Sequence, residues 1–369
     1  MEDRLRAVLD VVEDLQEIRG PMGAQALDLF ESEGGLSEPM ARWALSTVCG
    51  RYTPEALRGC IRTDLSGGVA ALMLARSVPT APLRALVLLL LRGARAVWAR
   101  PSRSQPSFTR LLIQAMSKRG LPVHLVEALE PTQFLRGAGS NGVTHLVAYG
   151  NDDTLAAMAQ LLPRGVRMEG HGHGFGLGLV VGGARIVEEG AARVARDVAL
   201  YDQHGCLSPQ TVLVEAAHAP GFARALANAL KALEDELPRG PVDAGRAVAI
   251  HQWQGAMAAV AEEFHRGPTY GVALLEHTRI IGSPGGRNIA VVPMKSWEKA
   301  WSAVGSELSA LTCLGVHGAP LERQALGLPL AAQPRVVQAG FMQDPPLDGP
   351  EDPRPALRNQ PASAARGDW

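Results

Sequence analysis

The residue best suited to covalent chemistry is Cys206, which lies in the polar run Tyr201-Asp-Gln-His-Gly-Cys-Leu-Ser-Pro-Gln210. The run separates an amphipathic segment, 187–200, from an apolar one, 211–215, so the pattern predicts a loop between a helix and a strand. A thiol in such a loop can have both the thiolate character and the access that nucleophilic catalysis needs. Most isolated cysteines are small buried hydrophobic residues, so position alone leaves both roles open.

A glycine- and histidine-rich stretch, 170–178, allows several interpretations. It contains Gly-x-Gly-x-x-Gly only in a degenerate sense, and a dinucleotide fingerprint should follow a first strand and open a helix. His171 and His173 could bind a metal, but no nearby carboxylate or cysteine completes a ligand set. Glycine also permits close approach of the backbone, so the stretch is either a flexible loop or a neighbour of the Cys206 loop.

Two polar turns each follow a predicted strand and precede a predicted helix. The first contains Arg100, Ser102 and Arg103, and an α/β sheet can hold a phosphate at such a turn. The arginines would be the cations there, and the helix start would donate N–H groups. An ordinary solvated turn explains the same residues. Gly150 and Asn151 occupy the corresponding position in the next unit, where a glycine could face a cofactor or simply turn the chain.

These residues need a scaffold that brings them together. The amino-terminal segment, up to about residue 60, has helical spacing, and from about Val69 helices and strands alternate. This alternation predicts a doubly wound parallel sheet, which binds ligands at the carboxyl ends of its strands. The predicted helices are 81–92, 105–118 and 152–162, and the predicted strands are 94–99, 122–126 and 143–148. A second unit from about residue 170 adds helices 221–237, 252–265 and 296–304 and strands 211–215, 271–275 and 288–292.

The composition excludes several classes of protein. The net charge of -1 gives no electrostatic reason for nucleic acid or an anionic membrane to be the main partner. The longest apolar run is far shorter than the ~18 residues that a spanning helix requires. The charged start lacks the apolar stretch of a signal peptide, and the cysteines have no zinc-site spacing. We therefore expect a cytoplasmic protein with reduced thiols, no metal and no membrane span.

In chain order, the segments 99–106, 149–153, 170–174 and 201–210 resemble the aldehyde dehydrogenase superfamily. Within it they are most similar to the acyl-CoA reductase family of the bacterial-luminescence fatty acid reductases. The resemblance implies an aldehyde-dehydrogenase-like α/β fold with two doubly wound parallel-sheet domains. It also implies a homo-oligomer, formed through a strand region near the carboxyl terminus. The expected parts are a helical segment plus dinucleotide-binding domain (1–165), a catalytic domain (166–335), and a strand or arm with a flexible Pro-rich tail (336–369).

The resemblance also implies a reaction. Cys206 matches the nucleophile that attacks a fatty acyl thioester, which could be acyl-CoA, an acyl carrier or an acyl group from a partner enzyme. Hydride from NADPH then releases an aldehyde. The segment 100–103 matches the part that holds the adenosine ribose. Arg103 replaces a glutamate of the hydrolytic relatives, which favours the 2′-phosphate of NADP. Gly150, followed by Asn151, matches a glycine that lies against the cofactor.

Other positions keep alternatives open. The stretch 170–174 replaces the water-activating glutamate of hydrolytic aldehyde dehydrogenases, which favours reduction, but the adjacent Glu169 could serve an enzyme that oxidises an aldehyde. Ser77 stands where the reductases carry an asparagine that stabilises the oxyanion, and loss of such a donor costs about 100-fold in rate. That change also fits a non-catalytic relative that binds acyl groups or a partner. His204 is a candidate to influence the Cys206 thiol.

Overall fold

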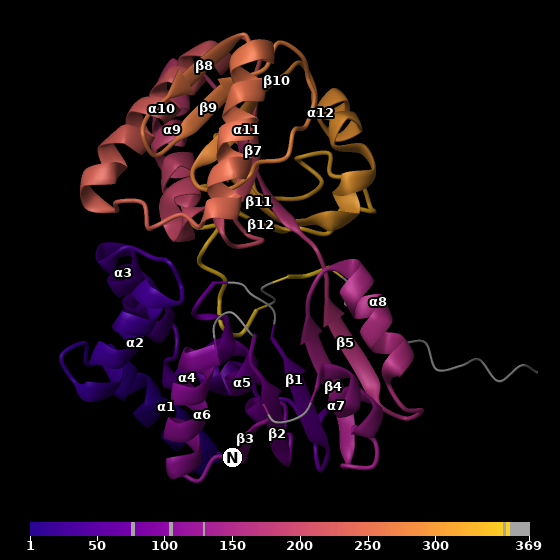
Figure 1. Cartoon of the computed structure of the whole chain (residues 1–369). Coiled ribbons are helices and arrows are strands. Elements are labelled where there is room, and N and C mark those ends of the chain that lie inside the picture. The colour runs from indigo at the N-terminus through magenta and orange to yellow at the C-terminus, as the bar shows by residue number, and fades with distance from the viewer. Residues whose placement is uncertain (75–77, 103–105, 128–129, 350–351, 355–369) are drawn as a thin grey trace, which may run out of the picture. The chain divides into compact units, whose positions relative to one another are not determined.

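The structure is a computed structural model that describes residues 1–74, 78–102, 106–127, 130–349 and 352–354 (Figure 1). The chain forms two compact units. Unit 1 comprises Met1–Glu33 and Leu45–His173, and unit 2 comprises Gly34–Ala44 and Gly174–Arg354. Each unit is built of helices around a largely parallel sheet, which confirms the predicted α/β fold class.

The sheet of unit 1 has the strand order β3-β2-β1-β4-β5, and all of its pairs are parallel. The order reverses at β1, because β2 and β3 extend from one side of it and β4 and β5 from the other. Ligands of doubly wound sheets bind beyond the carboxyl ends of the strands at such a switch point. The strands are β1 (Val69–Met73), β2 (Ala96–Arg100), β3 (Val123–Leu125), β4 (Val143–Tyr149) and β5 (Arg167–His171).

Helices cover both faces of this sheet (Figure 1). The helices of unit 1 are α1 (Glu2–Gln16), α2 (Pro21–Ser32), α4 (Pro54–Gly59), α5 (Ala81–Leu91), α6 (Pro106–Lys118), α7 (Pro131–Gly137) and α8 (Asp152–Leu161). On one face, Phe134 of α7 and Leu155 of α8 pack against the strands around Ala71. On the other, the almost wholly apolar α5 contacts β1 and β2, and α1 packs on α5 and α6. The buried side of α1, with Leu5 and Leu15, confirms the predicted helical start.

The sheet of unit 2 has the strand order β12-β11-β6-β7-β10-β9-β8. Only the β8–β9 pair is antiparallel. The strands are β6 (Phe175–Val180), β7 (Pro209–Glu215), β8 (Glu263–Arg266), β9 (Gly271–Leu274), β10 (Asn288–Met294), β11 (Leu311–His317) and β12 (Arg335–Gln338). The inner strands β6, β7 and β10 are almost wholly buried, as parallel strands covered on both faces should be.

The helices of unit 2 form a layer on each face of its sheet (Figure 1). They are α9 (Ala184–Ala199), α10 (Ala219–Glu236), α11 (Ala244–Val260) and α12 (Trp297–Val304), and α3 (Glu38–Cys49) crosses the division between the units. Val194 of α9 and Phe222 of α10 pack in one core, and Met257 of α11 and Trp301 of α12 pack in the other. None of the helices in the described ranges has the length and apolar character needed to cross a bilayer.

One prediction about an element in unit 2 is wrong. The predicted helix 252–265 is instead the end of α11 followed by β8. Asp243 caps α11 by accepting a hydrogen bond from the Arg246 N–H at 2.9 Å, so the helix begins and ends earlier. The side chains of Gln343 and Leu347 are buried in unit 2, and residues 350, 351 and 355–369 of the predicted Pro-rich tail lie outside the described residues.

The interpretation of 170–178 as a flexible loop is also wrong. The stretch lies in β5 up to His171 and in β6 from Phe175. Glycine-rich strands are uncommon because glycine gains little from packing, and an interior glycine often marks a close approach of another backbone. The chain passes from unit 1 to unit 2 inside this stretch, between His173 and Gly174.

Candidate active site

The loop that joins α9 to β7 presents Cys206 at the surface of unit 2. A 3₁₀ turn, Leu200–Gln203, follows α9, and β7 begins at Pro209. Gln203 before the cysteine and Leu207 after it are buried, whereas Cys206 is exposed. The loop therefore exposes its thiol while its two ends are held in the protein interior.

The other three cysteines lack this access. Cys49, Cys60 and Cys313 are all buried. Burial raises the pKa of Cys49 and of Cys313 to about 12, so these thiols stay protonated at neutral pH. The thiolate is the reactive form, and Cys206 is the one exposed cysteine of the four.

The backbone just before Cys206 has an uncommon conformation. Tyr201, Asp202 and Gln203 have φ angles of 54°, 49° and 60°. This left-handed region costs a non-glycine residue roughly 1–2 kcal/mol. Such strain persists only where the surroundings impose it, and it is concentrated at functional sites. The His204 N–H closes the turn by donating to the Tyr201 carbonyl oxygen at 2.9 Å.

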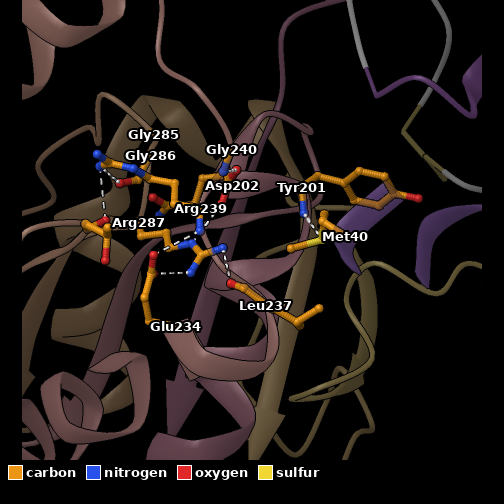
Figure 2. A network of polar contacts seen from close by, with 12 residues as sticks. Met40, Tyr201, Asp202, Glu234, Leu237, Arg239, Gly240, Gly285, Gly286 and Arg287 are labelled. Carbon is orange, nitrogen blue, oxygen red and sulfur yellow. Dashed lines mark hydrogen bonds and ion pairs between the residues drawn. The ribbon is translucent and has the colours of Figure 1, made fainter. Parts of the chain in front are cut away.

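The amino-terminal part of α3 holds the first residue of this turn. The Tyr201 N–H points to the Met40 sulfur at 3.4 Å (Figure 2). The Tyr201 ring packs edge-on against Trp43, with the ring centroids 5.5 Å apart. Sequence reasoning missed both contacts, because Met40 and Trp43 look like ordinary helical core residues.

Strands β6 and β11 hold the other end of the loop. The Thr312 hydroxyl lies 2.6 Å from the Cys206 carbonyl oxygen, and the Gly176 N–H donates to the Ser208 carbonyl at 3.1 Å. A Cβ on Gly176 would lie only 2.5 Å from the Leu207 carbonyl oxygen, so the approach requires glycine. This confirms the interpretation of the glycine-rich stretch as a neighbour of the Cys206 loop.

In unit 1, two predicted cofactor residues lie at the carboxyl ends of the two strands that flank β1. Arg100 is the last residue of β2, and Met73 of β1 pairs with both Arg100 and Ala148 of β4. Gly150 comes two residues after Ala148, beyond the carboxyl end of β4. It therefore lies at the switch point between β1 and β4, where a doubly wound sheet binds its ligand.

The surroundings of Gly150 suit a cofactor that approaches the backbone. A Cβ at this position would lie 3.5 to 3.7 Å from the side chains of Thr154 and Leu155, which is ordinary contact. The protein's own packing therefore does not require glycine here, and a small residue leaves room for a dinucleotide. Asn151 caps α8, because its Oδ1 accepts a hydrogen bond from the Thr154 N–H at 2.8 Å. The start of this helix offers N–H groups to a phosphate.

The roles of all the predicted site residues remain predictions. Ser77 and Arg103 lie outside the described residues. Ser102 is half-buried directly after β2 and Pro101. His204 is half-buried two residues before the exposed thiol.

Glu169, the candidate water-activating base, belongs to an ion-pair network. Its carboxylate lies 2.9 Å from Nη1 of Arg92 and 3.5 Å from Nε2 of His171. The hydrogen bond from His171 and the charge and hydrogen bond of Arg92 lower the pKa of Glu169 to about 2. A general base works best with a pKa near the working pH, so Glu169 is a weak base. No sequence pattern singled out Arg92, which also pairs with Asp64 at 2.7 Å.

The two histidines of the glycine-rich stretch contact side chains of β4 and α8. The His171 ring stacks on Tyr149, with ring centroids 4.8 Å apart and planes 20° from parallel. The His173 backbone N–H donates to Asp152 Oδ1 at 3.0 Å. Within the described ranges, no three His, Cys, Asp or Glu side chains gather to hold a metal ion.

The sequence of the chain matches one known protein family over most of its length. The family model for "Acyl-CoA reductase (LuxC)" matches residues 63–356. The matched range includes the Arg100, Gly150 and Cys206 segments and most of the chain. No curated protein sequence matches the chain significantly.

Solved structures share the fold at low sequence identity. An oxidoreductase from Marinobacter aquaeolei matches with a TM-score of 0.75 and 15% identity, over 92% of this chain and 78% of that one. An NAD-dependent benzaldehyde dehydrogenase from Corynebacterium glutamicum matches with a TM-score of 0.72 and 15% identity, over 90% and 79%. An NAD-dependent aldehyde dehydrogenase from Sinorhizobium meliloti matches with a TM-score of 0.69 and 14% identity, over 91% and 74%. The chain thus has the aldehyde dehydrogenase fold.

Proposed function

The chain belongs to the acyl-CoA reductase family, and we propose that it reduces a fatty acyl thioester to an aldehyde, with Cys206 as nucleophile and NADPH as reductant. The family and the fold together make it an aldehyde-related oxidoreductase. The observation that carries the finer proposal is the exposure of Cys206 alone among the cysteines, in a loop held at both ends.

The proposed reaction begins with attack of the Cys206 thiolate on the acyl carbonyl carbon. The thiolate of coenzyme A or of another acyl carrier leaves and takes a proton, and an acyl-enzyme thioester remains. When bound, the reduced nicotinamide supplies the hydride that this thioester needs at its carbonyl carbon. The C–S bond to Cys206 then breaks, the sulfur takes a proton, and the aldehyde leaves. The acyl group is reduced by two electrons, and the thiol is regenerated.

Unit 1 supplies the proposed cofactor site. Gly150 leaves room at the switch point of the sheet, and the start of α8 offers N–H groups to a phosphate. The arginine at the end of β2, Arg100, would bring a cation toward the adenosine end. Together with Arg103 it favours NADPH over NADH, because an arginine can bind the 2′-phosphate with paired hydrogen bonds.

The state of Glu169 favours reduction over oxidation of an aldehyde. Hydrolysis of the acyl-enzyme requires a base that activates water, and the pKa of Glu169, about 2, leaves its carboxylate with little affinity for a proton. The carboxylate is also engaged by Arg92 and His171. An acyl-enzyme that water attacks slowly persists until hydride arrives, as a reductase requires.

The decisive experiment measures NADPH consumption with saturated acyl-CoAs of several chain lengths, in the wild type and in Cys206→Ala. We expect consumption and aldehyde formation in the wild type, and a loss of more than 100-fold in Cys206→Ala. Without NADPH, mass spectrometry should find the acyl group on the peptide that contains Cys206. Cys60→Ala is the matched control, because it removes a buried thiol and should keep activity.

The proposal fails if Cys206→Ala keeps wild-type turnover or if the acyl group is found on another residue. If the proposal holds, the rate of aldehyde formation with acyl-CoA can be compared with the rate with an acyl carrier protein and with an acyl-adenylate-forming partner enzyme. This comparison identifies the donor. Light scattering on the same preparations tests whether the chain forms the homo-oligomer that the resemblance implies, with the edge strand β12 as the candidate contact.

A further inference from the structure

The strained backbone of the described chain is concentrated in one buried network. The non-glycine residues with positive φ in the described ranges are Tyr201, Asp202, Gln203 and Arg287. Three of them form the turn before Cys206, and the fourth, Arg287, pairs with one of the three (Figure 2). Such clustering of left-handed residues is typical of a functional site whose surroundings impose one conformation.

Arg287 is wholly buried, and each arm of its guanidinium has a partner (Figure 2). Nε donates to Asp202 Oδ1 at 2.8 Å, and Nη1 donates to Glu234 at 2.9 Å. Nη2 donates to the Leu237 carbonyl oxygen at 2.7 Å. A planar fork with three separate partners fixes both the position and the orientation of the Asp202 carboxylate.

Asp202 makes two further contacts with the surrounding backbone. Its second carboxylate oxygen accepts a hydrogen bond from the Gly240 N–H at 3.0 Å. Its carbonyl oxygen accepts one from the Gly286 N–H at 2.9 Å. The turn is thus held through both side chain and backbone by the segments 237–240 and 285–287.

Gln203 joins the two ends of the Cys206 loop. Its amide nitrogen donates to the carbonyl oxygen of Pro209, the first residue of β7, at 2.9 Å. The same nitrogen lies 3.1 Å from the Asn288 carbonyl, and its amide oxygen accepts from the Asn288 N–H at 2.8 Å. The Gln203 side chain therefore links the two ends of the loop that contains Cys206, and it also binds the loop to the first residue of β10.

We propose that Arg287 and Gln203 are positioning residues that hold Cys206 in place for attack on the acyl thioester, an inference that rests on the proposed function. A buried ion pair is often replaceable by apolar residues without loss of stability, so stability alone does not account for it. Glycines would also adopt the left-handed turn without strain, but they would lack the side chains that fix it. Both residues act through the loop and touch no reacting atom.

The test uses Arg287→Lys, which keeps the charge but loses the fork, and Gln203→Met, which keeps the length but loses the hydrogen bonds. We expect kcat for acyl-CoA reduction to fall tenfold or more in each, while KM changes by less than about threefold. Misplacement of a reacting group by about 1 Å can cost about 100-fold in rate. Alkylation of Cys206 by iodoacetamide should stay within about threefold of the wild-type rate, because this small reagent needs access and no aligned substrate.

The matched control is Arg224→Lys, which alters an arginine–glutamate pair on the exposed side of α10 in the same unit. It should keep the wild-type kcat.

Hydrogen exchange provides a readout that does not depend on activity. In Arg287→Lys and Gln203→Met, the backbone N–H groups of His204 and Ser208, which are hydrogen-bonded in the loop, should lose protection, while helix α9 keeps it.

The inference is overturned if the folded variants retain the wild-type kcat, or if the exchange of the loop is unchanged. It is also overturned if Arg224→Lys loses as much activity as Arg287→Lys. Should Arg287→Lys fail to fold, Gln203→Met alone decides, since it leaves the ion pair intact. Absence of thioester reduction in the wild type would refute the proposed function, and hydrogen exchange would still show whether the two residues hold the loop.

Discussion

Replacement of Gly176 by alanine should displace the Cys206 loop although it changes no residue of that loop. Gly176 lies in β6, and its N–H donates to the Ser208 carbonyl. An added Cβ would lie 2.5 Å from the Leu207 carbonyl oxygen and 2.6 Å from that of Ser208. Both obstacles are backbone atoms, so no side chain can rotate away, and either the strand or the loop must move.

The size of this displacement follows from the contact distances. An ordinary contact begins at about 3.4 Å, so the 2.5 Å approach must open by about 0.9 Å. Overpacking of this kind typically lowers the free energy of unfolding by about 1–3 kcal/mol. A shift near 1 Å in a nucleophile can cost about 100-fold, so kcat/KM for acyl-CoA should fall by about two orders of magnitude, or about 2.7 kcal/mol.

The assay combines urea unfolding with the kinetics of acyl-enzyme formation. The matched control is Gly178→Ala in the same strand, where the three atoms nearest to the added Cβ all belong to Val212 of β7, the first at 2.9 Å. We expect both variants to lose stability, but only Gly176→Ala to lose acylation rate to the extent estimated above. Equal losses of rate in the two variants, or wild-type kinetics in Gly176→Ala, would refute the argument that β6 positions the loop.

Two predictions concern unit 1. Gly150→Ala should raise the Kd for NADPH about tenfold with little change in Tm, because a Cβ there makes only ordinary contacts within the protein. Nucleotide fluorescence titration measures the Kd and thermal melts measure the Tm. An unchanged Kd would remove Gly150 from the cofactor site. Glu169→Gln should make the stability of the protein less dependent on pH. The pKa of Glu169 is about 2 in the folded state, against an ordinary value of 4.5. The ionised carboxylate therefore stabilises the fold above pH 4.5, and this stabilisation is lost as the pH falls toward 2. Because its side chain is 36% exposed, screening reduces the effect to about 1 kcal/mol, and urea titrations at pH 7 and pH 3 should show a larger difference between wild type and variant at pH 7.

The sequence predicted the parts of the fold that depend on local pattern. The alternation of amphipathic and apolar segments indicated parallel sheets, and the strand 143–148 agrees closely with β4 (Val143–Tyr149). It did not predict β8, because Glu263–Arg266 continues the polarity of the preceding helix and becomes a strand only by pairing with β9. Pairing at a sheet edge is a tertiary effect that a local window of sequence does not contain.

The candidate site also contains residues that the sequence could predict and residues that it could not. The exposed thiol and the glycine at the switch point could be predicted, since a lone cysteine in a polar run and a glycine after a strand are local signals. Arg287 could not be predicted. It lies some 80 residues after Cys206 in a glycine-rich turn, and nothing around it distinguishes a buried positioning residue from a solvated arginine. Only the folded topology, which sets the turn before β10 beside the turn before β7, reveals the pair.

The choice of residues in the turn before Cys206 explains why its strain is tolerated. Glycine would lower the conformational cost at each of the three positions, but each side chain there anchors its own backbone. Tyr201 packs on Trp43, Asp202 binds Arg287, and Gln203 bridges to the start of β7. With these three anchors in place, several contacts must break together before the loop can adopt a second conformation. We therefore expect substitutions in this turn to change activity and stability by different amounts. Some that relieve the backbone strain should stabilise the protein while slowing its reaction.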